Sequence, residues 1–248
     1  MSADAAMPAL APLHLAGERL MLDPAGVLAW PAGRALVVSD LHLEKGSRQA
    51  ALRGRFVPPY DTRETLARLA LVLRRHAPVR RLVLLGDSFD DAGGSARMHA
   101  EDRDALARLL SAVDAVDWVL GNHDPTPPEA LPGAAAEEVR LGPLTFRHVA
   151  APGTPPPGEV SGHFHPKATL ATRAGGVTRP CFVADARRLV MPAFGAYTGG
   201  LDVRDPAIGV LFPRGGRAFL LGRDRLHAVP LPPGRGHARV AERQHALT

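Results

Sequence analysis

The chain has 248 residues, of which 46% are hydrophobic and 22% charged, so it can bury a substantial core in one domain or two. Its single cysteine, Cys181, excludes internal disulfides and does not support a thiolate zinc cluster, and a reducing, cytoplasmic compartment is expected. No apolar segment is long enough to cross a bilayer, and no signal peptide is expected. A formal net charge of +5 favours polyanionic partners.

The first elements in chain order are predicted strands. Glu18–Asp23 and Val27–Trp30 are separated by a Pro-Ala-Gly turn, which predicts a β-hairpin. Three short, nearly continuous apolar segments follow, and such segments are typical of strands buried on both faces of a parallel sheet. These segments are Ala35–Val38, Leu82–Leu85 and Val116–Leu120.

Two amphipathic helices are predicted between these three strands. Their apolar residues follow the i, i+3, i+4, i+7 spacing of a helix face. They are Leu66, Leu69, Ala70 and Leu73 in the first helix, and Leu106, Leu109, Leu110 and Val113 in the second. Asp61 followed by Glu64 is a candidate capping box for the first helix. The first half is therefore predicted to be βαβαβ, in which ligands collect at the carboxyl ends of the strands.

The second half is predicted to be a mostly antiparallel sheet packed on the first. Gly- and Pro-rich turns separate its short β-like segments, and no strong helix is expected. The segments are Leu144–His148, Lys167–Ala171, Cys181–Ala184, Leu189–Met191, Ile208–Phe212, Ala218–Leu221 and Leu226–Val229. We predict a single domain over residues 1–231. From residue 232 the sequence loses periodicity, which predicts a mobile tail over 232–248.

All three predicted strands of the first half end in a potential metal ligand. The candidate ligands of the whole chain are, in order, Asp40, His42, Asp87, Asn122, His148, His163 and His165. Asp40 and His42 are two residues apart, so both side chains point to one side if the strand end stays extended. Carboxylate, imidazole and amide donors suit Mn²⁺, Fe or Zn²⁺ better than Ca²⁺. Seven donors are enough for two ions that share a bridging carboxylate.

The order of these residues resembles the motifs of the calcineurin-like metallophosphoesterases. The family pattern is DxH, GD, GNH followed by an acid, an isolated His, and GHxH. It stands here as Asp40-Leu41-His42, Gly86-Asp87, Gly121-Asn122-His123-Asp124, His148 and Gly162-His163-Phe164-His165. Residues 39–46, 58–66, 86–91, 121–125, 162–168 and 192–202 are also similar to the bacterial ligase-associated DNA damage response phosphoesterase/endonuclease branch. Asp90 departs from that branch, in which a histidine is expected at this position.

The resemblance implies an α/β fold, a four-layer α/β/β/α sandwich, with two metals at the sheet edges. It assigns one metal to Asp40, His42 and His165, the other to Asn122, His148 and His163, and makes Asp87 the bridge. His123 is then the proton donor or transition-state stabiliser, and Asp124 is its orienting partner. The implied cofactor is a pair of divalent ions, Mn²⁺ first, with Fe or Zn²⁺ as alternatives.

The implied function is that of a two-metal phosphodiesterase or endonuclease acting on DNA in repair, by in-line attack of a metal-bound hydroxide on phosphorus. DNA or another phosphodiester is the expected substrate, without a membrane. A ligase-associated helicase, a nuclease and a DNA ligase are the expected protein partners. Two alternatives stay open: a phosphatase or phosphodiesterase of a nucleotide or other small molecule, and a metal-stabilised DNA-binding or scaffold subunit with little turnover.

Two further groups of residues are candidates for substrate contacts. Arg48, Arg53 and Arg55 lie just beyond the first motif and can contact phosphates, with a solvated loop as the alternative. Phe194 and Tyr197 lie in a glycine-rich stretch and are able to stack on a base. Packing in the core or in a turn is the alternative for both aromatic residues.

Overall fold

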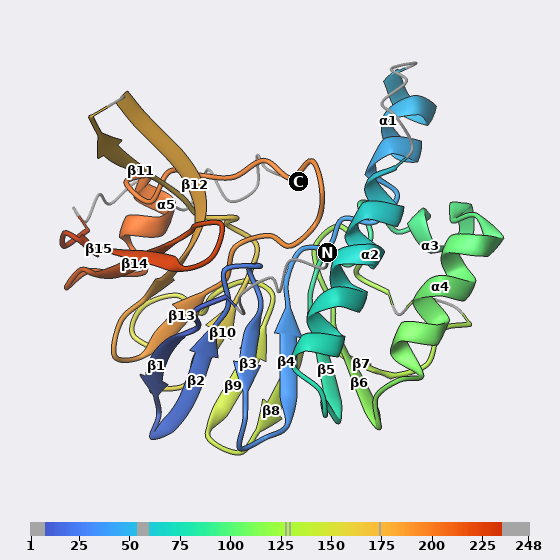
Figure 1. The fold of residues 1–248 in the computed structure, drawn as a ribbon, viewed down its shortest axis with the longest axis horizontal. Helices are drawn as coiled ribbons and strands as arrows, with labels where there is room; N and C mark the ends of the chain where they lie inside the picture. The colour runs from blue at the N-terminus through green and yellow to red at the C-terminus, as the bar shows by residue number, and fades with distance from the viewer. Residues whose placement is uncertain (1–7, 54–59, 127, 129, 174, 235–248) are drawn as a thin grey trace, which may run out of the picture.

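Two mixed β-sheets form the centre of the fold (Figure 1). The structure is a computed structural model that describes residues 8–53, 60–126, 128, 130–173 and 175–234. The first sheet has seven strands in the order β1-β2-β3-β4-β5-β6-β7. These strands are β1 (Ala11–Leu15), β2 (Glu18–Leu22), β3 (Leu28–Trp30), β4 (Ala35–Val38), β5 (Arg81–Leu85), β6 (Ala115–Val119) and β7 (Ala134–Ala136).

The second sheet has eight strands. Seven follow the order β15-β14-β12-β13-β10-β9-β8, and β11 pairs with β12 beside this path. The strands are β8 (Glu138–Leu141), β9 (Leu144–Arg147), β10 (Glu159–Ser161), β11 (Lys167–Thr172), β12 (Gly175–Ala184), β13 (Arg188–Val190), β14 (Gly216–Leu221) and β15 (Leu226–Leu231). The expected antiparallel pairing holds for the outer strands, whereas β10 runs parallel to both of its neighbours, β9 and β13.

The βαβαβ unit predicted for the first half is confirmed. Strands β4, β5 and β6 are parallel neighbours. The connections between them contain α1 (Lys45–Arg53), α2 (Asp61–Arg75), α3 (Gly94–Arg97) and α4 (Ala100–Leu110). The hairpin formed by β2 and β3 is also confirmed, and β1 extends it by pairing with β2.

Three apolar clusters hold four layers together, which confirms the predicted sandwich. Successive residues of β4 alternate between the clusters: Leu36 and Val38 pack with α2 and α4, while Val37 packs between the two sheets. Figure 1 shows α2 and α4 on the outer face of the seven-stranded sheet. The third cluster covers the outer face of the second sheet, where α5 (Pro206–Gly209) is the short helix of the fourth layer.

The strand predicted over Ile208–Phe212 is wrong, because α5 occupies the first part of that segment. Asp205 is the N-cap of this helix: its side chain accepts a hydrogen bond from the backbone N–H of Ala207. Proline follows at the first helical position, where its fixed φ favours a helix start. The local Asp-Pro signal therefore outweighs the apolar, β-like composition of the residues that follow.

The capping box predicted for α2 is also wrong. The residue before the helix is Tyr60, and its side chain makes no cap hydrogen bond. The Asp61 carboxylate instead accepts a hydrogen bond from the backbone N–H of Gly46 at 2.9 Å. This contact ties the start of α2 to the start of α1, so a local motif is replaced by a tertiary one.

Among the described residues, no helix is both long enough and apolar enough to span a membrane. The tail predicted from residue 232 is described only as far as residue 234, and the remainder lies outside the described residues. Cys181, on β12, is fully buried, as expected of a small apolar residue.

We predict that native Cys181 reacts very slowly with thiol reagents at pH 8. Burial, together with the negative charge of Asp202, raises the pKa of its thiol to about 12. The thiol therefore stays protonated at pH 8, and the thiolate is the reactive form. Labelling with a chromogenic disulfide reagent should be slow in the native protein and fast in denaturant. An Ala171→Cys variant, whose new thiol is exposed on β11, is the control and should label at once. Prompt labelling of native Cys181 would contradict its burial.

Candidate metal centre

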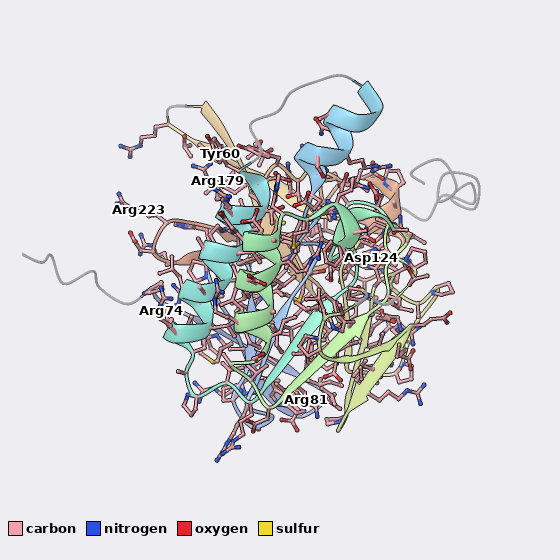
Figure 2. All side chains as sticks on the ribbon, turned by 90° about the vertical axis from the view of Figure 1, so that its right-hand side faces the viewer. Tyr60, Arg74, Arg81, Asp124, Arg179 and Arg223 are labelled. Atoms are coloured by element: carbon pink, nitrogen blue, oxygen red, sulfur yellow. The ribbon has the colours of Figure 1, made fainter. Side chains whose placement is uncertain are left out.

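The seven predicted ligands follow the carboxyl ends of strands from both sheets. Asp40 and His42 follow β4, Asp87 follows β5, Asn122 follows β6, His148 follows β9, and His163 and His165 follow β10. Figure 2 shows this polarity: Arg81 at the start of β5 lies near the bottom, and Asp124 beyond the end of β6 lies higher, at about mid-height. The parallel pairing of β10 therefore matters, because it brings its histidines to the edge at which β4, β5 and β6 end.

Three of these residues form a first cluster. The Nε2 atom of His165 lies 3.0 Å from Asp40 Oδ1 and 3.3 Å from His42 Nε2. All three ligand atoms lie within 4.8 Å of one another, and Asp40 and His42 are buried. Two imidazole nitrogens and a carboxylate oxygen directed at one point are a donor set that a transition metal ion satisfies.

A second cluster lies beside the first. The Oδ1 atom of Asn122 is 3.0 Å from His148 Nε2 and 3.0 Å from His163 Nδ1. The two histidine nitrogens are themselves 3.3 Å apart. His163 thus presents Nδ1 where His148 presents Nε2, and both nitrogens face the same amide oxygen. An amide oxygen and two imidazoles again form a set of metal donors.

The carboxylate of Asp87 joins the two clusters. Its Oδ2 atom lies 3.2 Å from His148 Nε2 in the second cluster and 3.9 Å from His42 Nε2 in the first. Its Oδ1 atom accepts a hydrogen bond of 2.9 Å from the backbone N–H of His123. One oxygen is therefore held by the backbone while the other faces both clusters. The residues fit a binuclear metal site with a shared carboxylate.

The sequence and fold of the chain are similar to those of a nuclease of known structure. No protein-family model and no curated protein matches the chain significantly. Among solved structures, the chain is similar to the crystal structure of the Pseudomonas putida nuclease MPE. The identity is 27%, the TM-score is 0.66, and the match covers 90% of this chain and 100% of the other.

The chain is a structural homologue of this nuclease. The predicted resemblance to the metallophosphoesterases and the predicted fold class are thereby confirmed. The two buried His/Asp clusters fit the binuclear metal site that such a phosphoesterase requires. The identity of the metal does not follow from this similarity.

The backbone of the candidate metal centre is left-handed at five of the predicted ligands. Positive φ angles occur at Asp40 (51°), His42 (43°), Asp87 (45°), His163 (69°) and His165 (45°). The extended strand end expected at Asp40 and His42 is therefore wrong, although both side chains do reach the first cluster. Non-glycine residues in this region are strained, and such strain persists only where surrounding contacts hold it.

Hydrogen bonds behind the clusters set the histidine tautomers. His42 Nδ1 lies 2.9 Å from Asp90 Oδ1, and His148 Nδ1 lies 3.3 Å from the carbonyl oxygen of Leu85. If each Nδ1 carries the proton, each Nε2 keeps its lone pair free for the centre. A carboxylate or carbonyl behind a histidine is the usual support of a metal ligand.

The electrostatics favour ionised carboxylates. Burial alone raises the pKa of Asp40, but His165, His148 and His42 together outweigh it and the net shift is downward. Burial and the charge of His148 lower the pKa of His163 to about 4, so this ring is neutral near pH 7. His148 is the exception: burial lowers its pKa, yet Asp87 and Asp40 raise it to about 9. A metal ion that binds there must displace its proton.

Asp90 is a functional candidate that the motif comparison overlooked. Besides His42, its carboxylate contacts Lys45 Nζ at 3.4 Å and an Arg48 guanidinium nitrogen at 3.1 Å. Its carbonyl oxygen also lies 2.8 Å from Nδ1 of His123. Burial raises its pKa, but the hydrogen bond from His42 and the charge of Lys45 lower it to about 2. Its position three residues after Asp87, where the family pattern is broken, is the signal that marks it.

His123 is oriented by the Asp90 carbonyl rather than by Asp124. With Nδ1 bonded to that carbonyl, the opposite atom of the ring, Nε2, lies 4.0 Å from Asp87 Oδ2 at the edge of the centre. The His123 side chain is 24% exposed, so solvent and substrate can reach it. This is a position from which Nε2 can exchange a proton with a bound ester.

The predicted pairing of Asp124 with His123 is wrong. The Asp124 carboxylate accepts backbone hydrogen bonds from Ser88 at 2.7 Å, Phe89 at 3.1 Å and Gly121 at 3.1 Å. It therefore fastens the loop after β5 to the loop after β6. Burial, reinforced by the charge of Asp87, raises its pKa to about 7.

The predicted substrate contacts have different outcomes. Arg48 forms ion pairs with Asp90 and Asp91. The Arg53 side chain and Arg55 lie outside the described residues. Phe194 is fully buried, and the Arg68 guanidinium lies 4.6 Å above its ring, so the core-packing alternative holds for this aromatic residue.

We predict that Asp90→Ala weakens Mn²⁺ binding by about 10- to 100-fold, because His42 loses the carboxylate that fixes its ring. The backbone carbonyl that orients His123 remains in this variant. Isothermal titration with Mn²⁺ measures the effect. Asp91→Ala is the matched control, since Asp91 pairs with Arg97 and Arg48 and contacts no predicted ligand. Equal Mn²⁺ affinity in the two variants would remove Asp90 from the centre.

We predict that Gly86→Ala disrupts the second cluster. Gly86 has a φ of 76°, and a methyl group on it would lie 2.2 Å from His148 Nδ1. Gly17 has a similar φ of 84° with nothing within 4 Å, so Gly17→Ala introduces backbone strain alone, worth about 1–2 kcal/mol. Gly86→Ala should cost more in urea unfolding and should also lower Mn²⁺ affinity. An equal cost, with Mn²⁺ binding unchanged, would refute the steric argument.

Proposed function

We propose that the protein is a two-metal phosphodiesterase that cleaves nucleic acid, specifically an endonuclease acting on DNA in repair. The observation that carries the proposal is the position of Asp87 Oδ2, which lies 3.2 Å from one cluster and 3.9 Å from the other. Two adjacent cation sites that share a carboxylate are the arrangement used to hydrolyse phosphate esters. The similarity to a nuclease at 27% identity supports the same substrate class.

Each predicted ligand has a role in this proposal. Asp40, His42 and His165 hold one divalent ion, Asn122, His148 and His163 hold the other, and Asp87 contacts both. When bound, such ions supply Lewis acidity toward a phosphate oxygen and activate a water molecule as the nucleophile. Mn²⁺ is the proposed ion, because the donors combine carboxylate and amide oxygens with imidazole nitrogens.

His123 is the proposed proton donor to the leaving oxygen. Its Nδ1 is committed to the Asp90 carbonyl, and its backbone N–H holds Asp87 Oδ1. Only Nε2 is left to face the substrate, so a protonated ring can donate from one defined atom. The proposal therefore requires the imidazolium form of His123 before the ester bond breaks.

The nucleic-acid substrate is supported by charge as well as by similarity. The chain has 30 lysine and arginine residues against 25 acids, a net charge of +5. Four of the acids, Asp40, Asp87, Asp90 and Asp124, are buried at the centre, so the rest of the chain is more basic than this net charge. A polyanion is attracted to such a surface in a salt-dependent way. The ligase-associated helicase, nuclease and DNA ligase remain proposed partners, and a cytoplasmic location remains proposed from the single cysteine.

We predict that the protein hydrolyses bis-p-nitrophenyl phosphate faster than p-nitrophenyl phosphate in Mn²⁺, and that EDTA abolishes both activities. His123→Ala should keep its metal and lose about 10²- to 10⁴-fold in rate, because only the proton donor is removed. Asp87→Ala should lose metal and rate together. Turnover is measured by nitrophenolate absorbance, and metal content by elemental analysis.

The same assay separates the alternatives. Preference for the monoester would favour a phosphatase, and metal binding without turnover of either ester would favour a scaffold subunit. Labelled single- and double-stranded oligonucleotides then test the nucleic-acid substrate. Diester turnover combined with failure to bind or cut any oligonucleotide would favour a small-molecule phosphodiesterase.

A further inference from the structure

Residues 194–200, here called the 194–200 loop, contact the backbone of two residues of the first cluster, Asp40 and His165. At one end, the backbone N–H of Gly195 donates to the Asp40 carbonyl oxygen at 3.1 Å. At the other end, Gly200 packs so closely on the His165 carbonyl that a side chain there would collide with it at 2.1 Å. The loop is therefore anchored on the backbone of two predicted ligands.

Tyr197 lies in the middle of this loop and is 52% exposed. Its φ is 60°, a left-handed conformation that costs a non-glycine residue conformational energy. Within the described part of the chain, no hydrogen bond, ion pair or ring contact involves its side chain. A large aromatic residue is thus held in a strained conformation while about half exposed, which does not serve the stability of the fold.

The loop is fixed without help from Tyr197. Phe194 fills the core beneath it, and the backbone N–H of Ala196 donates to Thr65 Oγ1 of α2 at 3.1 Å. Thr198 Oγ1 donates to the carbonyl of Gly195 at 3.2 Å and closes the turn. Phe194 and Tyr197, which looked equivalent in the sequence, therefore have opposite roles: the first anchors the loop and the second is presented by it.

We propose that Tyr197 binds substrate by stacking on a nucleobase next to the phosphate at the metal centre. Two residues of chain span at most about 7 Å, so the Tyr197 backbone lies within that distance of Gly195. The backbone N–H of Gly195 in turn lies 3.1 Å from the carbonyl oxygen of Asp40. The ring is thus within reach of the nucleotides that flank a phosphate bound there. Stacking on an aromatic ring accepts any base, since every base has a π face. This inference rests on the proposed nucleic-acid substrate and adds a specificity-determining residue to it.

The test compares Tyr197→Ala, Tyr197→Phe and Tyr197→Gly with the unaltered protein in Mn²⁺. The substrate is a labelled single-stranded oligonucleotide, with and without abasic positions beside the cleaved bond. Tyr197→Ala should raise the KM for the intact oligonucleotide about 5- to 100-fold, and Tyr197→Phe should restore it, because the ring rather than the hydroxyl stacks. Abasic positions should weaken binding by the unaltered protein and leave the Ala variant unaffected.

Two controls separate stacking from structure. Tyr197→Gly relieves the left-handed strain, so it should lose oligonucleotide binding without a lower thermal midpoint. Leu71→Ala removes a side chain that is 58% exposed on α2, about 15 Å along the helix from its start, and should change nothing. The Mn²⁺ affinity measured by isothermal titration should stay within about twofold of the original in all variants, because none of them alters a predicted metal ligand.

Each result decides between the two proposals. If the unaltered protein cuts the oligonucleotide and Tyr197→Ala cuts it equally well, the stacking role is overturned while the nuclease proposal stands. The stacking role is also overturned if Tyr197→Phe is as defective as Tyr197→Ala, or if the Mn²⁺ affinity falls in parallel. If the unaltered protein hydrolyses the small diester but neither binds nor cuts nucleic acid, the substrate proposal fails and the stacking role fails with it.

Discussion

The centre depends on one buried carboxylate, that of Asp87. A carboxylate removed from water must be compensated by hydrogen bonds or opposite charge, and the two Asp87 oxygens obtain this compensation differently. One oxygen accepts a backbone N–H of the His123 loop, and the other faces imidazoles that come from both sheets. The same group therefore fixes the backbone of His123 and joins the two clusters.

Around this carboxylate the chain accepts backbone strain in order to aim its side chains. Asp40 and His163 are both left-handed, and each is locked by the other, because the backbone N–H of His163 donates to the Asp40 carboxylate. Ser39 Oγ donates to the same carboxylate at 2.5 Å. Strain at one ligand is thus held by contacts from another ligand, and the centre is fixed as a unit rather than residue by residue.

The sequence allowed the clustered donor residues and the parallel strands that carry them to be predicted, because both are encoded locally. Short apolar segments indicated β4, β5 and β6, and the ordered motifs indicated the seven donors. The roles of Asp90 and Asp124 could not be predicted in the same way. Asp90 meets His42 across 48 positions, and Asp124 meets Ser88 across 36, so their partners depend on the tertiary fold.

The errors have a similar origin. Asp61 has the spacing of a capping residue, yet its carboxylate bonds the backbone of Gly46, 15 positions away, because that contact is available only once α1 and α2 have packed. At α5 the opposite holds. There the local cap formed by Asp205 and Pro206 outweighs the apolar residues that suggested a strand. Whether a local signal prevails thus depends on whether a distant partner competes for the same polar group.

The parallel orientation of β10 has a consequence for how the protein matures. The first four donors lie between positions 40 and 122, whereas the three remaining histidines lie between 148 and 165. A chain emerging from the ribosome in N- to C-terminal order can form the βαβαβ unit early, but at that stage it offers only an incomplete and open set of donors. If the centre holds two ions, their capture would wait until β9 and β10 have docked, and metal loading would then report completion of the second sheet. Bound ions would then cross-link the two sheets of the newly made chain.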